Sequence, residues 1–134
     1  PIRTIKVFFK TFGVIFECQD LRLEQINKET TDVFCTLNVT IQEMTVTGDS
    51  VKSLCSLYVS GGRNVALKQP TRQTSTYKPN DKLSDSEHAV DGNVDNRFED
   101  GQSCTHTDKD DPSPSWAVTF NTSFVVNQFI LYNR

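Results

Sequence analysis

The residues best suited to chemistry in this chain of 134 residues lie in one loop, from His88 to Asn93. Asp91 offers a carboxylate, Asn93 offers an amide oxygen, and Gly92 between them lets the backbone curl. Calcium is a hard cation that binds six to eight oxygens of this kind. The alternative is that Asp-Gly-Asn simply makes a turn, which is what these residue types do most often. The loop alone leaves both interpretations open.

Cysteines and glycosylation sequons form a second set of residues with distinct chemistry. The four cysteines are Cys18, Cys35, Cys55 and Cys104, and the sequons begin at Asn38 and Asn121. The cysteines include no Cys-x-x-Cys pair, and none lies at zinc-ligand spacing from His88, so a zinc site is not expected. An even number of widely spaced cysteines is typical of disulfides in an oxidising compartment, and sequons are used there too. Together they predict an extracellular protein, either secreted or part of a cell-surface ectodomain.

Composition and charge exclude several classes of protein. Apolar residues make up 36% and charged residues 23%, which is not the composition of a disordered chain, a coiled coil or a collagen. The net charge of −3 argues against nucleic-acid binding, and no apolar run is long enough to span a membrane. No P-loop, nucleophile or metalloprotease motif is present, and no pair of carboxylates stands out, so we do not expect an enzyme. Because the chain starts at Pro1 without Met or a signal peptide, we expect a processed or partial product.

The elements that must position these residues are expected to be strands. Thr, Val, Ile and Phe are abundant, whereas there are three Ala and one Met, and β-branched and aromatic residues favour strands. Alternating or continuous apolar patterns predict strands at Thr4–Phe9, Phe12–Glu17, Val33–Ile41, Val51–Val59, Asn64–Leu67, Trp116–Phe120 and Phe124–Tyr132. Asp20–Glu29 fits a short helix or a strand. Glu87–Ser115 has no periodicity, and its Asp, Asn, Gly and Ser indicate an ordered functional loop. The fold class is therefore predicted to be all-β.

A series of short motifs from Arg63 onward resembles a known family. In chain order they are Asn64-Val65-Ala66-Leu67, Pro70-Thr71, Ala89-Val90-Asp91-Gly92-Asn93 and Ser103-Cys104-Thr105-His106. In this order they resemble the first half of an F-type lectin (fucolectin) domain, over residues 63–134. Residues 1–62 more distantly resemble the closing half of such a domain. The resemblance implies a jelly-roll, discoidin-like β-sandwich that is partial or permuted: either a piece of a tandem array joined at Gly61-Gly62, or one sandwich built from both halves.

The resemblance also implies a calcium site and a set of disulfides. The calcium contacts would be His88, through its carbonyl, and Asp91, Asn93 and Ser103. A glutamate of the closing strand completes this site in the family, and Ser56 stands in its place here. The family's usual pairing, carried over to this chain, would join Cys104 to Cys55, which requires the permuted packing. Cys18–Cys35 is the local pair under either arrangement.

Sugar recognition in the family uses one His and two Arg, with an aromatic against the methyl group of fucose. His106 matches the histidine and Arg134 the first arginine, while the second arginine has no counterpart because the chain ends. We therefore expect a calcium-assisted, fucose-type carbohydrate-binding module of a larger extracellular protein that binds fucosylated glycans, as tandem repeats or an oligomer, in glycan recognition or innate defence. The alternative is a discoidin-like adhesion or structural domain that has lost sugar binding.

Overall fold

A computed structural model of the chain describes residues 4–60, 63–79, 84–98, 103–126 and 128–133. Their strands and 3-10 helices are β1 (Lys6–Thr11), β2 (Val14–Glu17), β3 (Arg22–Gln25), β4 (Thr30–Phe34), β5 (Ile41–Thr47), η1 (Asp49–Ser53), β6 (Leu54–Val59), β7 (Thr71–Gln73), η3 (Ser86–Val90), β8 (Ser115–Phe124) and β9 (Gln128–Asn133). No helix within these ranges has the length and apolar character needed to cross a membrane.

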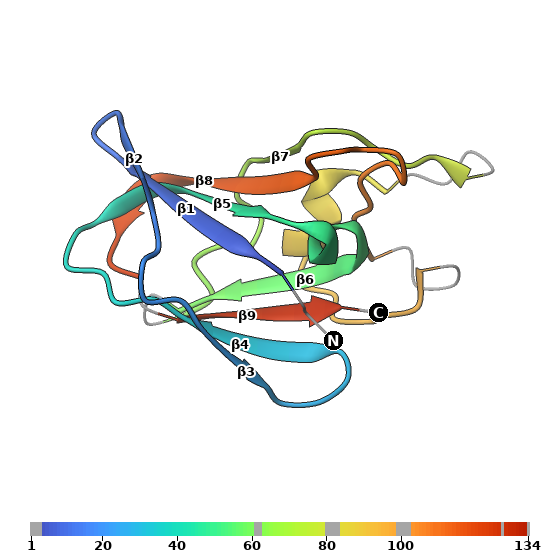
Figure 1. Cartoon of the computed structure of the whole chain (residues 1–134), viewed down its shortest axis with the longest axis horizontal. Helices are drawn as coiled ribbons and strands as arrows, with labels where there is room; N and C mark the ends of the chain where they lie inside the picture. Colours follow the sequence, from blue (N-terminus) through green and yellow to red (C-terminus); the bar gives the residue numbers. More distant parts are fainter. Residues whose placement is uncertain (1–3, 61–62, 80–83, 99–102, 127, 134) are drawn as a thin grey trace.

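The strands form two antiparallel sheets that lie one above the other (Figure 1). The five-stranded sheet has the order β2-β1-β5-β8-β7, and the four-stranded sheet has the order β3-β4-β9-β6. Side chains from both sheets meet in a shared core, in which Phe9 and Trp116 of one sheet and Leu57 and Phe129 of the other are fully buried. The prediction of an all-β sandwich is confirmed.

Both halves of the chain contribute strands to both sheets. β5 of the first half pairs with β8 of the second, so that Met44 lies opposite Val118. β9 of the second half lies between β4 and β6 of the first. Residues on either side of Gly61-Gly62 therefore pack into one sandwich, as the permuted arrangement requires.

Two disulfides connect the described cysteines. Cys18 is bonded to Cys35, as predicted, and Cys55 is bonded to Cys104, the pair that was expected only for the permuted packing. Leu54 and Ser56 pair with neighbouring residues of β9, which leaves Cys55 as the extra residue of a β-bulge. A bulge redirects a side chain locally, and this one brings Cys55 to Cys104 on the connection between β7 and β8. The two bonds are compatible with an extracellular protein.

The predicted strand over Val33–Ile41 is wrong. β4 ends at Phe34, and β5 begins at Ile41 in the other sheet. Cys35 remains buried through its disulfide, but Val39 is 43% exposed, so the apolar alternation continues through a connection that is not a strand. The strand expected at Asn64–Leu67 is likewise reduced to a single bridge between Ser60 and Asn64.

Trp116 anchors β8 to the loops above it. Its side chain is fully buried, and its Nε1–H donates to the Ser86 carbonyl at 2.9 Å. This bond fixes the start of η3 against the five-stranded sheet. Trp116 therefore belongs to the core and is not available as a sugar platform.

Candidate functional site

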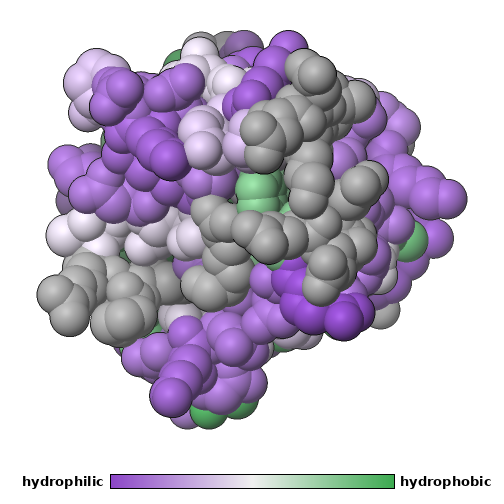
Figure 2. Space-filling model, turned by 90° about the vertical axis from the view of Figure 1, so that its right-hand side faces the viewer, coloured by the Kyte–Doolittle hydropathy of each residue, from purple (hydrophilic) through white to green (hydrophobic). Residues whose placement is uncertain are grey.

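The described residues that were predicted to bind calcium or sugar gather at one end of the sandwich, where the connection between β7 and β8 lies (Figure 1). Figure 2 views this end and shows that its described residues are mostly hydrophilic. At its centre, residues 103–107 are all buried. The Thr105 N–H donates to the Leu54 carbonyl at 2.9 Å, and the His106 N–H donates to the Ser84 carbonyl at 3.1 Å. This segment is therefore held between β6 and the residues that precede η3.

The His106 ring lies between two aromatic side chains. Its centroid is 4.7 Å from that of Tyr77 and 5.7 Å from that of Phe98. The side chain is buried, with 6% of the residue exposed, and Nδ1 is hydrogen-bonded to the Thr107 carbonyl. A carbonyl oxygen only accepts, so Nδ1 is the donor in this bond. The orientation of the His106 ring is thus held by the carbonyl of the next residue.

Lys109 covers the Tyr77 ring. Its Nζ lies 4.6 Å from the ring centroid, a cation–π distance. Interaction with Tyr77, first through a side-chain hydrogen bond and then through charge, raises the pKa of the Lys109 ammonium. The ammonium, the phenol ring and the imidazole therefore follow one another across this end of the molecule.

Asp111 ties the two loops that carry these groups to each other. Its Oδ2 accepts from the hydroxyls of Thr74 and Ser75, both at 2.5 Å, and its Oδ1 accepts from the Ser113 N–H at 3.0 Å. The hydrogen bonds from Ser75, Thr74 and Ser113, in that order, hold the pKa of Asp111 below its ordinary value. Asp111 thus anchors the loop that carries Tyr77.

The predicted calcium loop is a series of Asx turns. Asp91 Oδ1 accepts the Asn93 N–H at 2.7 Å, Asn93 Oδ1 accepts the Asp95 N–H at 2.9 Å, and Asp95 Oδ1 accepts the Arg97 N–H at 3.0 Å. Gly92 has φ +92°, a conformation that favours glycine. Arg97 also binds the Asp95 carboxylate with its side chain, which lowers the pKa of Asp95 to about 2. The turn interpretation therefore accounts for the backbone of this loop.

The predicted ligands are oxygen donors of the kind that a hard cation prefers, but together they carry little negative charge. The Ser103 hydroxyl donates to the Asp95 carbonyl, which links Ser103 to the Asx loop, and His88 lies at the other end of that loop in η3. Ser56 adjoins Cys55, and Ser103 adjoins Cys104, so the disulfide places the closing strand beside this loop. Among the predicted ligands only Asp91 is a carboxylate. A calcium site with fewer charged ligands has a lower affinity, so these residues would hold the ion weakly.

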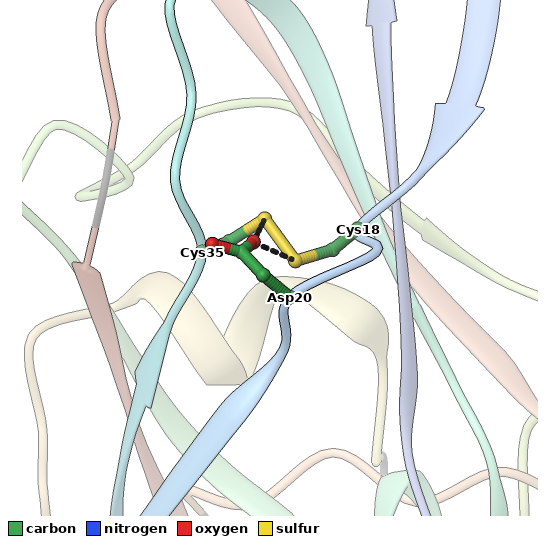
Figure 3. A group of neighbouring side chains, drawn as sticks. All are labelled: Cys18, Asp20 and Cys35. Carbon is green, nitrogen blue, oxygen red and sulfur yellow. Dashed lines mark hydrogen bonds between the residues drawn. A yellow bond between two sulfur atoms is a disulfide. The ribbon is translucent and has the colours of Figure 1, made fainter.

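Asp20 lies beside the Cys18–Cys35 disulfide (Figure 3). Its Oδ1 is 3.5 Å from Cys18 Sγ and 3.7 Å from Cys35 Sγ, and it accepts the Thr36 N–H at 3.1 Å. Both sulfurs are oxidised and carry no proton, so the sulfur contacts are not conventional hydrogen bonds and the group is not a thiolate metal site. Asp20 thus holds the backbone at Thr36, just after Cys35.

The remaining predicted residues fall elsewhere. Asn38 and Asn121 are exposed near the Ile41–Phe124 pair, at the other end of the sandwich from residues 103–107. Arg134 lies outside the described residues.

Sequence reasoning missed three neighbours of the site, Tyr77, Phe98 and Asp95. The aromatic pair lies 29 and 8 positions from His106 in the chain, and only the fold brings both rings to it. The regular spacing of Asp91, Asn93 and Asp95, two positions apart, is the one sequence signal that could have extended the predicted site to Asp95.

Comparison with known proteins finds no matching family model, no matching curated protein and no matching solved structure.

Proposed function

We propose that the chain is a calcium-assisted carbohydrate-binding module of the F-type lectin kind, with fucose-type sugars as its ligands. The observation that carries this proposal is the group formed by His106, Tyr77 and Lys109 at the loop end of the sandwich. Aromatic faces pack against the apolar faces of sugars, and charged donors make the stronger hydrogen bonds to their hydroxyls. This group combines both features.

Each member of the group has a distinct role in the proposal. His106, oriented by its hydrogen bond to the Thr107 carbonyl, is the imidazole that the family resemblance assigns to the sugar. The exposed part of the half-buried Tyr77 side chain packs against the fucose methyl group, and the Lys109 ammonium beside it donates to sugar hydroxyls. Calcium, when bound by Asp91, Asn93, Ser103 and the His88 carbonyl, supplies positive charge that holds the loop in shape.

Isothermal titration of the protein with L-fucose, in calcium and in a chelator, tests this function. We expect binding that weakens in the chelator and that is lost in His106→Ala and Lys109→Ala. Lys10→Ala is the matched control, because Lys10 is a lysine of β1 near the other end of the sandwich. Equal binding by wild type and His106→Ala, with both proteins folded, would refute the role of His106.

The second candidate is a discoidin-like adhesion or structural domain without sugar binding. Two observations favour it: His106 is only 6% exposed, and the buried Ser56 hydroxyl stands where the family has a carboxylate. A glycan array probed with and without chelator separates the two functions. Absence of any glycan signal from folded, calcium-loaded protein would support the second.

A further inference from the structure

Three residues form a row on the outer face of the four-stranded sheet. Arg22 of β3 lies opposite Phe34 of β4, and Phe34 lies opposite Gln128 of β9. The neighbours of Phe34 in the chain, Val33 and Cys35, are buried in the core, so Phe34 faces outward. The Arg22 guanidinium lies 5.4 Å from the Phe34 ring centroid. The row thus presents a cation, an aromatic ring and an amide side by side.

The chain that follows β4 turns this row into a groove. β4 ends at Phe34, and the chain that follows is held by the Cys35 disulfide and by the hydrogen bond from Thr36 to Asp20. The resulting groove has a volume of about 420 Å³, and Leu37 and Asn38 complete its lining. Its size and its mixture of apolar and donor groups suit a sugar ring.

Asn38 is also an exposed glycan acceptor in an Asn-Val-Thr sequon. A sugar attached there is tethered beside the groove, and tethering gives an effective concentration on the order of millimolar. A groove that binds the sugar only weakly is then still occupied for much of the time. We propose that this groove seats the innermost N-acetylglucosamine of the chain's own N-glycan on Asn38. The inference rests on modification of Asn38 and is independent of fucose binding at the other end.

The expected contacts follow from the chemistry of the lining. The apolar face of the pyranose packs on the half-buried Phe34 and on Leu37. The Arg22 guanidinium and the Gln128 amide donate to sugar hydroxyls and to the N-acetyl carbonyl. The glycan core then covers apolar surface that is otherwise in water.

The second sequon provides a matched comparison. Asn121 also lines a groove, of about 360 Å³, with Lys10, Glu43 and Thr119 among its other residues. The only aromatic residue of that lining is Phe120, which is 5% exposed and points into the core. A glycan on Asn121 therefore meets a polar surface without an aromatic face, and we expect it to extend into solvent.

The test uses protein secreted from eukaryotic cells in two single-sequon forms, Asn121→Gln and Asn38→Gln, with the double variant as the glycan-free reference. Enzymatic removal is avoided because it would leave an aspartate beside Arg22. We expect the glycan on Asn38, even trimmed to one N-acetylglucosamine, to raise Tm by about 2–5 °C, and the glycan on Asn121 to raise it by less than about 1 °C. Arg22→Ala, compared in glycosylated and glycan-free forms, should remove most of the Asn38 increment.

A spectroscopic readout separates docking from general stabilisation. With isotope-labelled glycans, the N-acetyl methyl signal on Asn38 should be displaced upfield by the Phe34 ring, and Phe34→Leu should restore it. The signal on Asn121 should match that of a free glycan. Equal signals and equal Tm increments at the two sites would overturn the proposal, as would mass spectra of the secreted protein that show Asn38 unmodified.

Discussion

Substitution of Asp20 by Asn should make the Cys18–Cys35 disulfide easier to reduce. Asp20 Oδ1 lies within 3.7 Å of both sulfurs, and hydrogen bonds from the Thr36 side chain and backbone hold the pKa of Asp20 below its ordinary value. The carboxylate is therefore ionised at neutral pH. Reduction begins when a thiolate attacks one sulfur and displaces the other as a thiolate. The Asp20 carboxylate repels the negative charge of both the attacking and the leaving thiolate.

The size of the effect follows from the geometry. A thiolate that bonds to Cys18 Sγ brings its charge roughly 4–6 Å from the carboxylate oxygen, which is itself 3.5 Å from that sulfur. At this separation, repulsion in a water-like dielectric corresponds to a rate difference of about three- to sixfold. Asn at position 20 keeps an oxygen that can accept the Thr36 N–H, so this backbone hydrogen bond is retained without the charge.

The assay measures the reduction of each disulfide by 2-mercaptoethanol, with alkylation of released thiols and peptide mass mapping. Asp20→Asn should accelerate loss of Cys18–Cys35 about three- to sixfold at low salt and less at about 0.5 M salt, where screening shortens the range of the charge. Cys55–Cys104 is the internal control and should react at an unchanged rate. Unchanged reduction of Cys18–Cys35 would refute the electrostatic argument, and equal acceleration of both bonds would indicate general loosening of the fold.

Three further outcomes are expected. Calcium at about five times its dissociation constant should stabilise the protein by about 1 kcal/mol, seen as a rise in Tm that Asp91→Ala abolishes; a rise that survives in the variant would place the ion elsewhere. Asp111→Ala should lower Tm at pH 7. Because the pKa of Asp111 is lower in the folded than in the unfolded protein, the stabilisation that its carboxylate provides is complete above the unfolded pKa of about 3.9 and is lost as the pH falls through the folded pKa. An equal loss of Tm at pH 7 and pH 2 would contradict that linkage. Trp116→Phe should cost about 2–4 kcal/mol in denaturant unfolding, because it leaves a cavity and an unpaired Ser86 carbonyl, and a cost near zero would show that the site repacks.

The sequence predicts those strands whose alternate side chains are buried in the core. The start of β8 lies where the apolar pattern places it, and β6 covers the predicted strand from Leu54 onward, whereas residues 51–53 belong to η1. Leu57, Val59 and Trp116 are buried. The edge strand β7 was missed because its central residue, Arg72, is exposed and bonded to Glu43, so that the segment reads as polar loop. Short edge strands lack the buried stripe on which pattern reasoning depends.

The candidate site is less predictable because its geometry comes from long-range contacts. The Asp91 turn is local, since Gly92 and its neighbours determine it through bonds two residues apart. The surroundings of His106 depend on Tyr77 and Phe98, which reach it only through the packing of three separate loop segments. No pattern of residue types along the chain encodes that encounter.

The Cys55–Cys104 bond also determines what a break in the chain would do. The two cysteines lie on opposite sides of Gly61-Gly62 in the sequence. A protease that cut at this dipeptide would leave two polypeptides joined by a covalent bond, with β9 of one still paired to β4 and β6 of the other. Such a nicked molecule would migrate as one species until reduced and as two afterwards. The same sandwich could thus persist as a disulfide-linked two-chain protein.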